Sequence, residues 1–496
     1  MIKLIYRIES DYMSKKRMLI VTSVILSVVT ISLGIVKLYQ TYALSNYIGD
    51  DTDTGIDVYI NDDSYASIPA NGSSNVYYIL TNTNPGTVKY GVAYQTTSGV
   101  TVKVYDTSED PATGTIEENG KKYIKLHLEN KNSTNKTIEL STVLGYENGG
   151  DLVVPNGVTL VNDKYTPPTL SKDVIINLYT KASKTTVTNN SITYNTAPSV
   201  SLMNDRLGGT TTSLDGGNIR YYGASPNNYI YFNCSDYSNQ TSSTCETWRI
   251  IGVFNGKLKI IRNTSIGSYS WDNKNKSTGA ESDYGKNDWT TARLMKLLNS
   301  SDYYTTDSND NGLGQSLYWN GASDKCYSGK NNATVDCNFT STGIKNDVTR
   351  NLISEETWNI GGWNSNSVYS NQFYGYERGT TVYSGRPTTW TGKIGLMYPS
   401  DYGYAADLSK CTKQLGSYID STCKSNDWLF NSNNQWTLTP NSDYVYLVFY
   451  VGSSGGLASH SADGSNYGVR PVLYLASDLA MESGDGSSSN PYKLSA

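Results

Sequence analysis

An uncharged apolar segment near the amino terminus constrains this chain more than any other feature. Met18 to Val36 is a run of 19 residues in which only Thr, Ser and Gly interrupt the Met, Leu, Ile and Val. At about 1.5 Å per residue, a helix of that length reaches roughly 28 Å, close to the thickness of the hydrocarbon core of a bilayer. The run therefore predicts a transmembrane helix over residues 18–37.

The charges beside this segment predict its orientation. Three basic residues at 15–17 abut its start, whereas only Lys37 follows closely. The positive-inside rule then leaves residues 1–17 in the cytoplasm and the bulk of the chain outside a single-pass cell-membrane protein. A cleaved signal peptide, with a poor cleavage site at Ala43-Leu44-Ser45, is the alternative. Secretory apolar regions are usually shorter, about 7 to 15 residues, which favours the uncleaved anchor.

Charge also restricts the partners of the extracellular part. The whole chain carries a net charge of −5, although residues 1–17 are net positive, so the remainder is acidic. Nucleic-acid binding requires clustered Lys and Arg, and the sequence has no basic stripe with interleaved aromatics. We expect no nucleic-acid partner.

Six cysteines form three couples with separations of 11, 11 and 12 positions. An even number of cysteines outside the membrane indicates disulfides, and three equally short loops favour local pairing. Zinc is the alternative, but zinc sites need cysteines two to about four residues apart, often with His, and this chain has two His. The expected pairs are Cys234 with Cys245, Cys326 with Cys337, and Cys411 with Cys423.

Alternating apolar residues predict a β-sandwich in the first extracellular segment. Several runs have a period of two, and polar turns such as Asn130 to Asn135 separate them. About seven short strands without a catalytic signature suggest an immunoglobulin-like sandwich over residues 52–181. His127 alternates with apolar neighbours and is expected to face solvent. The runs begin at Val76, Val88, Val100, Ile124 and Ile138.

A polar stretch separates this segment from the second half of the chain. Residues 182–223 are rich in Ser, Thr and Asn and lack sustained apolar periodicity, which predicts a linker. We therefore expect a second extracellular domain over residues 224–496.

The second domain carries recognisable local patterns. Thr247 to Val253 and Lys257 to Ile261 form a predicted hairpin with Asn255-Gly256 as the turn. Asp288 is a candidate N-cap for a helix with an apolar face of Leu294, Met295, Leu297 and Leu298. A second helix is predicted over Asp347 to Asn359, ending before two glycines.

The closing segment adds Gly468-Val469-Arg470-Pro471-Val472-Leu473-Tyr474-Leu475. Together with the hairpin and with Trp289, Arg293 and Leu297 to Asn299, it resembles a family of uncharacterised bacterial surface domains. That family is related to the C-type-lectin and formylglycine-generating-enzyme folds and has no established chemistry. The resemblance implies an α+β C-type-lectin-like domain over about 228 to the end. Within the closing motif, we expect a buried terminal strand and an Arg470 that donates structural hydrogen bonds.

The same resemblance suggests where a ligand would bind. In C-type-lectin-like surface proteins the last strands and their loops carry the ligand face, which here corresponds to residues 436–467. We expect Val445, Leu447, Phe449 and Val451 to face the core, leaving tyrosines on the other face. Packing of these tyrosines beneath neighbouring loops is the alternative. The candidate ligand-binding residues are Trp436, Tyr444, Tyr446, Tyr450, Ser453, Ser454, His460 and Tyr467.

Enzymatic and metal-dependent roles have weaker support in the sequence. Copper or iron chemistry of the related enzymes needs free cysteine pairs or several His, and neither is expected here. A hydrolase built on two carboxylates needs no His, but nothing in the spacing of the acids distinguishes them from surface acids. The available carboxylates are Glu355, Glu356, Glu377, Asp401 and Asp407.

A calcium loop is the one metal motif to consider. Asp307, Asn309 and Asn311 fit its first positions, but Tyr318 occupies the twelfth, where a bidentate Glu is required. An ordinary Asn- and Asp-rich turn is the alternative, and we expect no bound cofactor.

These observations favour a membrane-anchored extracellular binding or adhesion protein whose disulfide-stapled, lectin-like head recognises a protein or glycan. A structural envelope component without a discrete ligand is the alternative, followed by a carboxylate-dependent surface hydrolase.

Overall fold

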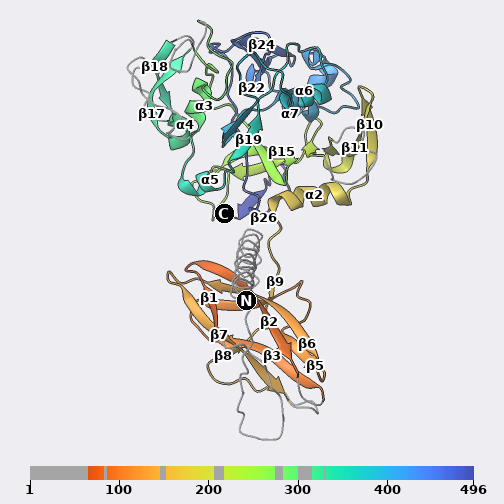
Figure 1. The fold of residues 1–496 in the computed structure, drawn as a ribbon, viewed down its shortest axis with the longest axis vertical. Coiled ribbons are helices and arrows are strands. Elements are labelled where there is room, and N and C mark those ends of the chain that lie inside the picture. The colour runs from red at the N-terminus through yellow and green to blue at the C-terminus, as the bar shows by residue number, and fades with distance from the viewer. Residues whose placement is uncertain are drawn as a thin grey trace, which may run out of the picture. The chain divides into compact units, whose positions relative to one another are not determined.

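A computed structural model describes residues 65–82, 86–145, 152–205, 217–273, 283–299, 316–328 and 331–495. For 326–328 and 331–335 it describes the backbone alone. The chain divides into two compact units, residues 1–167 and residues 168–496 (Figure 1). Strands dominate both units.

The first unit contains two sheets that share one hydrophobic core. All strand pairs are antiparallel except β4 with β9. One sheet has the order β1(Tyr65–Ile68), β7(Lys136–Gly145), β3(Val88–Gln95) and β5(Thr113–Ile116), with β8(Val158–Leu160) also paired to β3. The other has the order β2(Gly72–Thr81), β6(Lys121–Asn130), β4(Val100–Tyr105) and β9(Lys164–Tyr165).

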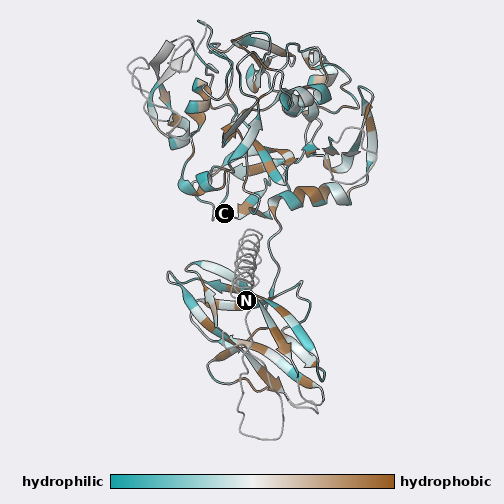
Figure 2. Cartoon of the chain, in the orientation of Figure 1, coloured by the Kyte–Doolittle hydropathy of each residue, from teal (hydrophilic) through white to brown (hydrophobic). Residues whose placement is uncertain are grey.

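The period-two pattern of the first unit is confirmed. Ile124, Leu126 and Leu128 of β6 are fully buried, and the alternating residues of the other predicted runs join them in the same core. Figure 2 shows hydrophobic and hydrophilic residues alternating along these strands. Since successive side chains of a strand point to opposite faces, each strand contributes one face to the shared core.

His127 does not face solvent as expected. It is 5% exposed, and its ring stacks on Tyr165 at 3.5 Å between centroids. Its Nδ1 lies 2.7 Å from Asn75 Oδ1. The short strand β9 pairs with β4 late in the chain and brings Tyr165 over the outer face of the sheet, which a local alternation pattern does not reveal.

The expected linker over 182–223 is wrong for its described residues, and so are the boundaries at 181 and 224. The second unit begins at Pro168. Its first helix, α2(Ser171–Lys181), buries Ile175 and Tyr179 in the core of that unit. The following strands are too short for a sustained pattern, but they bury Tyr194 and Leu202.

A nine-stranded sheet forms the centre of the second unit. Its main path runs β10(Thr185–Asn189), β11(Ile192–Ala197), β12(Leu202–Asn204), β13(Ile219–Tyr221), β15(Glu246–Phe254), β16(Lys257–Arg262), β25(Val472–Tyr474) and β21(Ile394–Gly395), and β14(Tyr229–Phe232) also pairs with β15. A three-stranded sheet comprises β22(Gln435–Pro440), β23(Leu447–Val451) and β24(Leu457–Ser461).

The remaining strands form two-stranded ribbons, and the remaining helices are short. The ribbons pair β17(Ser323–Ser328) with β18(Asn331–Asn338), β19(Glu356–Asn359) with β20(Thr389–Gly392), and β26(Ala480–Ser483) with β27(Lys493–Ser495). The helices are α3(Arg293–Leu298), α4(Leu317–Asn320), α5(Asp347–Asn351), α6(Ser370–Glu377), α7(Pro399–Ala405) and α8(Ser421–Lys424).

The predicted hairpin at the start of the second domain is confirmed. β15 pairs with β16, and the turn residues Asn255 and Gly256 have φ values of 49° and 75°. Positive φ at both central residues is what a tight hairpin turn with right-handed strand twist requires. The ladder shifts register between Ile250 and Gly252. A Cβ on Gly252 would lie 2.1 Å from the carbonyl oxygen of Ile219, so a glycine lets β13 approach at this irregularity.

The two predicted helices are confirmed in part. The apolar face of the first is buried, but α3 begins at Arg293, and Asp288 instead accepts hydrogen bonds from the backbone and hydroxyl of Thr290 in the preceding turn. The second helix is shorter than expected. α5 ends at Asn351, and residues 356–359 form β19, because Trp358 pairs across the ribbon with Trp390.

The closing motif forms a buried strand, as expected. Val472, Leu473 and Leu475 are fully buried, and β25 pairs with β16 on one side and β21 on the other. Arg470 is 5% exposed and donates to the backbone oxygens of Arg262 and Leu429. Its role as a structural donor follows from these contacts.

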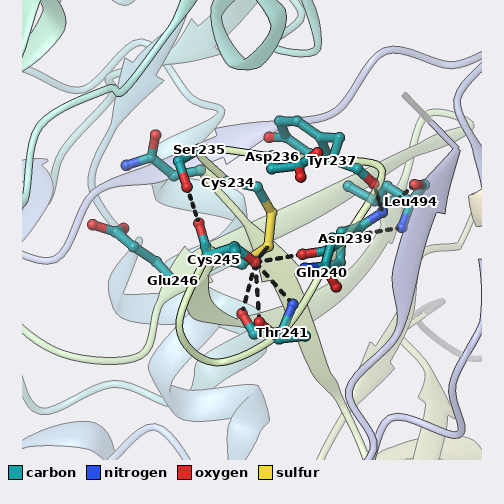
Figure 3. The surroundings of a disulfide bond; sticks show 12 residues. Cys234, Ser235, Asp236, Tyr237, Asn239, Gln240, Thr241, Cys245, Glu246 and Leu494 are labelled. Atoms are coloured by element: carbon teal, nitrogen blue, oxygen red, sulfur yellow. Dashed lines mark hydrogen bonds between the residues drawn. A yellow bond between two sulfur atoms is a disulfide. The ribbon is translucent and has the colours of Figure 1, made fainter.

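Two of the three expected disulfides are present. Cys234 bonds to Cys245 (Figure 3), and Cys411 bonds to Cys423. Cys337 is buried in β18, whereas the side chain of Cys326 lies outside the described part of the chain, so that pair stays a prediction. The predicted anchor at 18–37 and the cytoplasmic residues 1–17 also lie outside it. No helix among the described residues is long and apolar enough to cross a membrane.

Replacing Cys411 and Cys423 together by Ser should lower the free energy of unfolding of the second unit. The bond closes a loop with a separation of 12 residues, which the chain-entropy model values at about 3 kcal/mol. Urea denaturation of the full chain followed by tryptophan fluorescence measures the change. An unchanged midpoint in the double variant would contradict a stabilising role.

Candidate functional site

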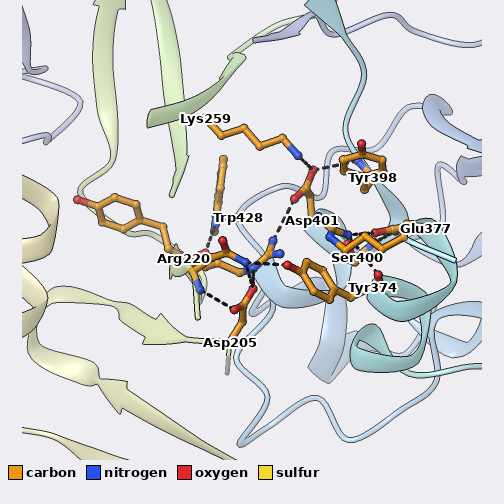
Figure 4. A network of polar contacts seen from close by, with 12 residues as sticks. Asp205, Arg220, Lys259, Tyr374, Glu377, Tyr398, Ser400, Asp401 and Trp428 are labelled. Carbon is orange, nitrogen blue, oxygen red and sulfur yellow. Dashed lines mark hydrogen bonds and ion pairs between the residues drawn. The ribbon is translucent and has the colours of Figure 1, made fainter. Parts of the chain in front are cut away.

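A cluster of buried charges joins the large sheet of the second unit to α7 (Figure 4). Asp401, in the first turn of α7, accepts at Oδ1 from Arg220 Nη1 of β13 at 3.0 Å. Its Oδ2 accepts from Lys259 Nζ of β16 at 2.5 Å and from the backbone N–H of Tyr398 at 2.9 Å. All three charged side chains are at most 1% exposed.

The acidic and basic side chains of this cluster are equal in number, and aromatic rings pack against both cations. Asp205 provides a second carboxylate, 2.5 Å from Arg220 Nε, so two acids face two bases. The Arg220 guanidinium lies 4.5 Å from the centre of the Phe254 ring, and Lys259 Nζ lies 4.4 Å from that of Tyr398. Burial lowers the pKa of Lys259 to about 8. Burial opposes ionisation of Asp401, yet Lys259 and Arg220 hold its pKa below the ordinary value.

Glu377 extends this polar network to α6. Its carboxylate accepts from the backbone N–H of Ser400 at 2.9 Å and from the Ser400 hydroxyl at 2.5 Å. Arg378 Nη1 lies 3.2 Å from Oε2. Glu377 is fully buried, and burial raises its pKa to about 7 in spite of these donors. The carboxyl end of α6 is therefore joined to the first turn of α7 through a glutamate whose pKa is raised.

The candidate carboxylates for hydrolysis do not gather in an open cleft. Glu355 is exposed, Glu356 pairs with Lys257, and Asp407 accepts from the backbone and hydroxyl of Ser409. The structure brings Asp401 and Glu377 near each other, but both are enclosed and engaged by protein donors. Their geometry is that of groups that hold secondary structure together.

Two candidate ligand residues are instead part of the core. Trp436 is 1% exposed and Tyr467 is 7% exposed, and their rings stack at 4.1 Å. Trp436 Nε1 donates to the backbone oxygen of Tyr269 at 2.8 Å. Tyr450 is half-buried against Tyr467, and His460 is exposed. A direct ligand contact by Trp436 or Tyr467 is therefore wrong, because neighbouring loops cover both rings.

The expected alternation along β23 is also wrong. Val448, Phe449 and Val451 are buried, whereas Leu447 and Tyr450 are partly exposed. β23 is the central strand between β22 and β24. Its neighbouring residues Val448 and Phe449 point to opposite faces of the sheet, and both are buried. A strand buried on both sides loses the simple inside-outside period.

Exposed tyrosines gather on the loop before β23. Tyr444 is 50% exposed, its ring lies 6.2 Å from that of Tyr446, and Tyr446 lies 5.1 Å from Tyr284. Tyr284 is itself 44% exposed. We call Tyr284, Tyr444 and Tyr446 the tyrosine platform. Sequence reasoning found Tyr444 and Tyr446 but missed Tyr284, which lies far away in the chain and outside any recognised motif.

Buried polar side chains hold this platform in place. Asn287 Nδ2 donates to the backbone oxygens of Tyr444 and Leu447 at 2.7 and 3.0 Å. Arg386 donates to Asn287 Oδ1 and to the backbone oxygen of Val445. Because Asn287 and Arg386 are both buried, the tyrosine loop is fixed from beneath.

A polar hollow lies beyond the other end of β23. It has a volume of about 650 Å³, and Ser453 is one of its lining residues, whereas Ser454 is exposed nearby. Its lining consists entirely of Asn, Gln, Ser, Thr and Gly. Besides Ser453 it includes Asn263, Asn433, Gln435 and Asn466.

The calcium candidates Asp307, Asn309 and Asn311 lie outside the described residues. In the part of the chain that the structure describes, no group of three or more His, Cys, Asp or Glu is suited to hold a metal ion.

Replacing Asp401 by Asn should destabilise the second unit strongly. The change leaves Arg220 and Lys259 with one fewer buried anion, and removing one partner of a buried ion pair costs about 3–5 kcal/mol. Urea denaturation measures the loss. The matched control is Asp478→Asn, at an exposed position, which should change stability by less than about 0.5 kcal/mol. Equal effects of the two variants would contradict this role of Asp401.

Glu377 should make stability depend on pH. Burial raises its folded-state pKa to about 7, above the ordinary 4.5 of a glutamate, so the folded chain binds the proton more tightly than the unfolded chain. Its contribution to the free energy of unfolding is therefore present at low pH and is lost as pH rises to about 7. Denaturant titrations between about pH 5 and 8 should show a smaller slope for Glu377→Gln but not for exposed Glu355→Gln. Identical pH profiles would contradict the shift.

Comparisons of the chain with models of known protein families, with curated proteins and with solved structures found no match.

Proposed function

We propose that this chain is a membrane-anchored, extracellular recognition protein. In this proposal residues 18–37 anchor it, the first unit is an immunoglobulin-like stalk, and the second unit is a C-type-lectin-like head that binds a protein or glycan. The observation that carries the proposal is the tyrosine platform. Its residues Tyr444 and Tyr446 lie on a loop fixed by buried Asn287 and Arg386, and the exposed Tyr284 lies beside Tyr446.

Physical properties of tyrosine support a binding role. Each ring offers a large apolar surface and a polar tip, and it loses little conformational entropy when it is ordered. Exposed large apolar groups that cluster are more informative than single ones, because a cluster leaves a continuous surface to cover. With Tyr444 and Tyr284 about half exposed and Tyr446 between them, the platform has this character.

Fold features support the assigned domains. Two sheets around one core in the first unit agree with an immunoglobulin-like stalk. The opening hairpin, the short helix α3 and the closing strand β25 beside β16 agree with a C-type-lectin-like head. The cysteine pairs Cys234–Cys245 and Cys411–Cys423 agree with an oxidising, extracellular location.

The proposal predicts saturable binding of the full chain to arrays of host glycans, mucins or bacterial wall polymers. Tyr444→Ala and Tyr446→Ala should each weaken that binding about tenfold, because buried aromatic contacts at interfaces often contribute more than 1 kcal/mol. Tyr123→Ala, at an exposed tyrosine of the first unit, serves as the control and should leave it unchanged.

Two outcomes would count against this account. No saturable binding to any array component would favour a structural envelope component without a discrete ligand. Turnover of a wall polymer that is lost in a carboxylate variant with a normal unfolding midpoint would favour a surface hydrolase.

A further inference from the structure

We propose that the polar hollow is a second binding site, one that takes the neutral, hydroxyl-rich end of an oligosaccharide without a metal ion. The proposal rests on the recognition role of the second unit, but it uses residues different from those of the tyrosine platform. The hollow lies beyond the carboxyl end of β23, whereas Tyr444 and Tyr446 precede that strand.

The chemistry of the lining selects the ligand class. None of the residues that line the hollow has an ionisable or a large apolar side chain. Such a wall provides no ion pair for a phosphate, a carboxylate or an ammonium group, and no surface for a lipid chain. Side-chain amides and hydroxyls both donate and accept hydrogen bonds, as sugar hydroxyls do. A volume of about 650 Å³ lies in the usual range of ligand sites.

Gln435 is a buried residue of the lining, held by the closing motif. It is 1% exposed, and its Oε1 accepts from Arg470 Nη1 at 3.3 Å. Arginine has donors and no acceptor, so the amide oxygen has to face Arg470 and the Nε2 group has to face elsewhere. That Nε2 makes no hydrogen bond to the described part of the protein. Because Nε2 is enclosed, a ligand in the hollow would instead meet the exposed amides and hydroxyl of Asn433, Ser453 and Asn466.

The rim of the hollow is already fixed in place. The backbone N–H of Ser453 donates to Asn434 Oδ1 at 2.8 Å, and that of Gly468 donates to the backbone oxygen of Asn434 at 2.8 Å. Ser265 Oγ accepts from the backbone N–H of Val469 at 3.0 Å. These bonds tie the rim to the closing motif, so binding would need little further ordering of the backbone.

The probes are chitotriose, maltotriose and mannotriose, with 3′-sialyllactose as a charged comparison. They are titrated by calorimetry into the full chain, kept in a buffer free of sugar-based detergents. At least one neutral trisaccharide should bind saturably in the range up to about 10 mM. Saturation by none of them would overturn the proposal, as would binding of sialyllactose alone. Array binding that persists in either case leaves the proposed function standing.

Variants then locate the bound sugar. Asn466→Trp places a large side chain at an exposed position of the lining and should reduce affinity at least about tenfold. Asn239→Trp, at an exposed asparagine that does not line the hollow, is the matched control and should bind as the parent chain does.

A second variant tests another part of the wall. Asn433→Trp, at an exposed position of the lining, should weaken binding by a similar factor, with thermal denaturation checking that the chain folds. Tyr444→Ala should leave the trisaccharide affinity unchanged. Loss of binding in Tyr444→Ala with retention in Asn466→Trp would place the sugar on the platform and overturn the assignment to the hollow.

Discussion

The carboxylate of Asp401 is the interaction on which the second unit depends most. It accepts hydrogen bonds from Arg220 of β13 and Lys259 of β16. It also accepts one from the backbone N–H of Tyr398, the N-cap residue of α7. Buried charges of this kind are stable only when every partner is present, because an unpaired charge in the core costs several kcal/mol. The cluster therefore fixes one arrangement of the large sheet against α7, which in turn packs on β22 and β23.

That fixed arrangement explains how surface loops can be shaped for binding. The tyrosine platform precedes β23 and the polar hollow follows it, so the two proposed sites belong to opposite ends of one buried strand. Each is supported from beneath by a buried arginine, Arg386 for the platform and Arg470 for the hollow. In the closing motif, Arg470 holds the Gln435 side chain and the backbone of Arg262 and Leu429 in place, which is a structural role.

Local sequence patterns predicted the parts of the fold that depend on residues close together in the chain. Alternating residues such as Ile124, Leu126 and Leu128 located strands, and Asn255-Gly256 located a hairpin. Short cysteine separations located two disulfides. Brief strands in a polar stretch carried too few apolar residues to be distinguished from a linker, which is why β10 to β13 were missed.

Long-range contacts were beyond the reach of the sequence. Arg220 and Lys259 meet Asp401 across 181 and 142 positions, and no spacing rule connects them. Tyr284 joins the platform, and Tyr165 covers His127, for the same reason. The burial of Trp436 and Tyr467 also depends on loops from elsewhere in the chain, so aromatic content alone overstated the exposed ligand face.

The most direct test of the recognition account is hydrogen–deuterium exchange of the full chain with and without purified mucin. The account predicts slower exchange confined to the segments that form the tyrosine platform and the polar hollow, around 263–268, 283–286, 431–435, 442–446, 453 and 466–468, with β16 and β25 unchanged. Protection confined to the first unit, or no protection at a mucin concentration that saturates the array signal, would contradict it.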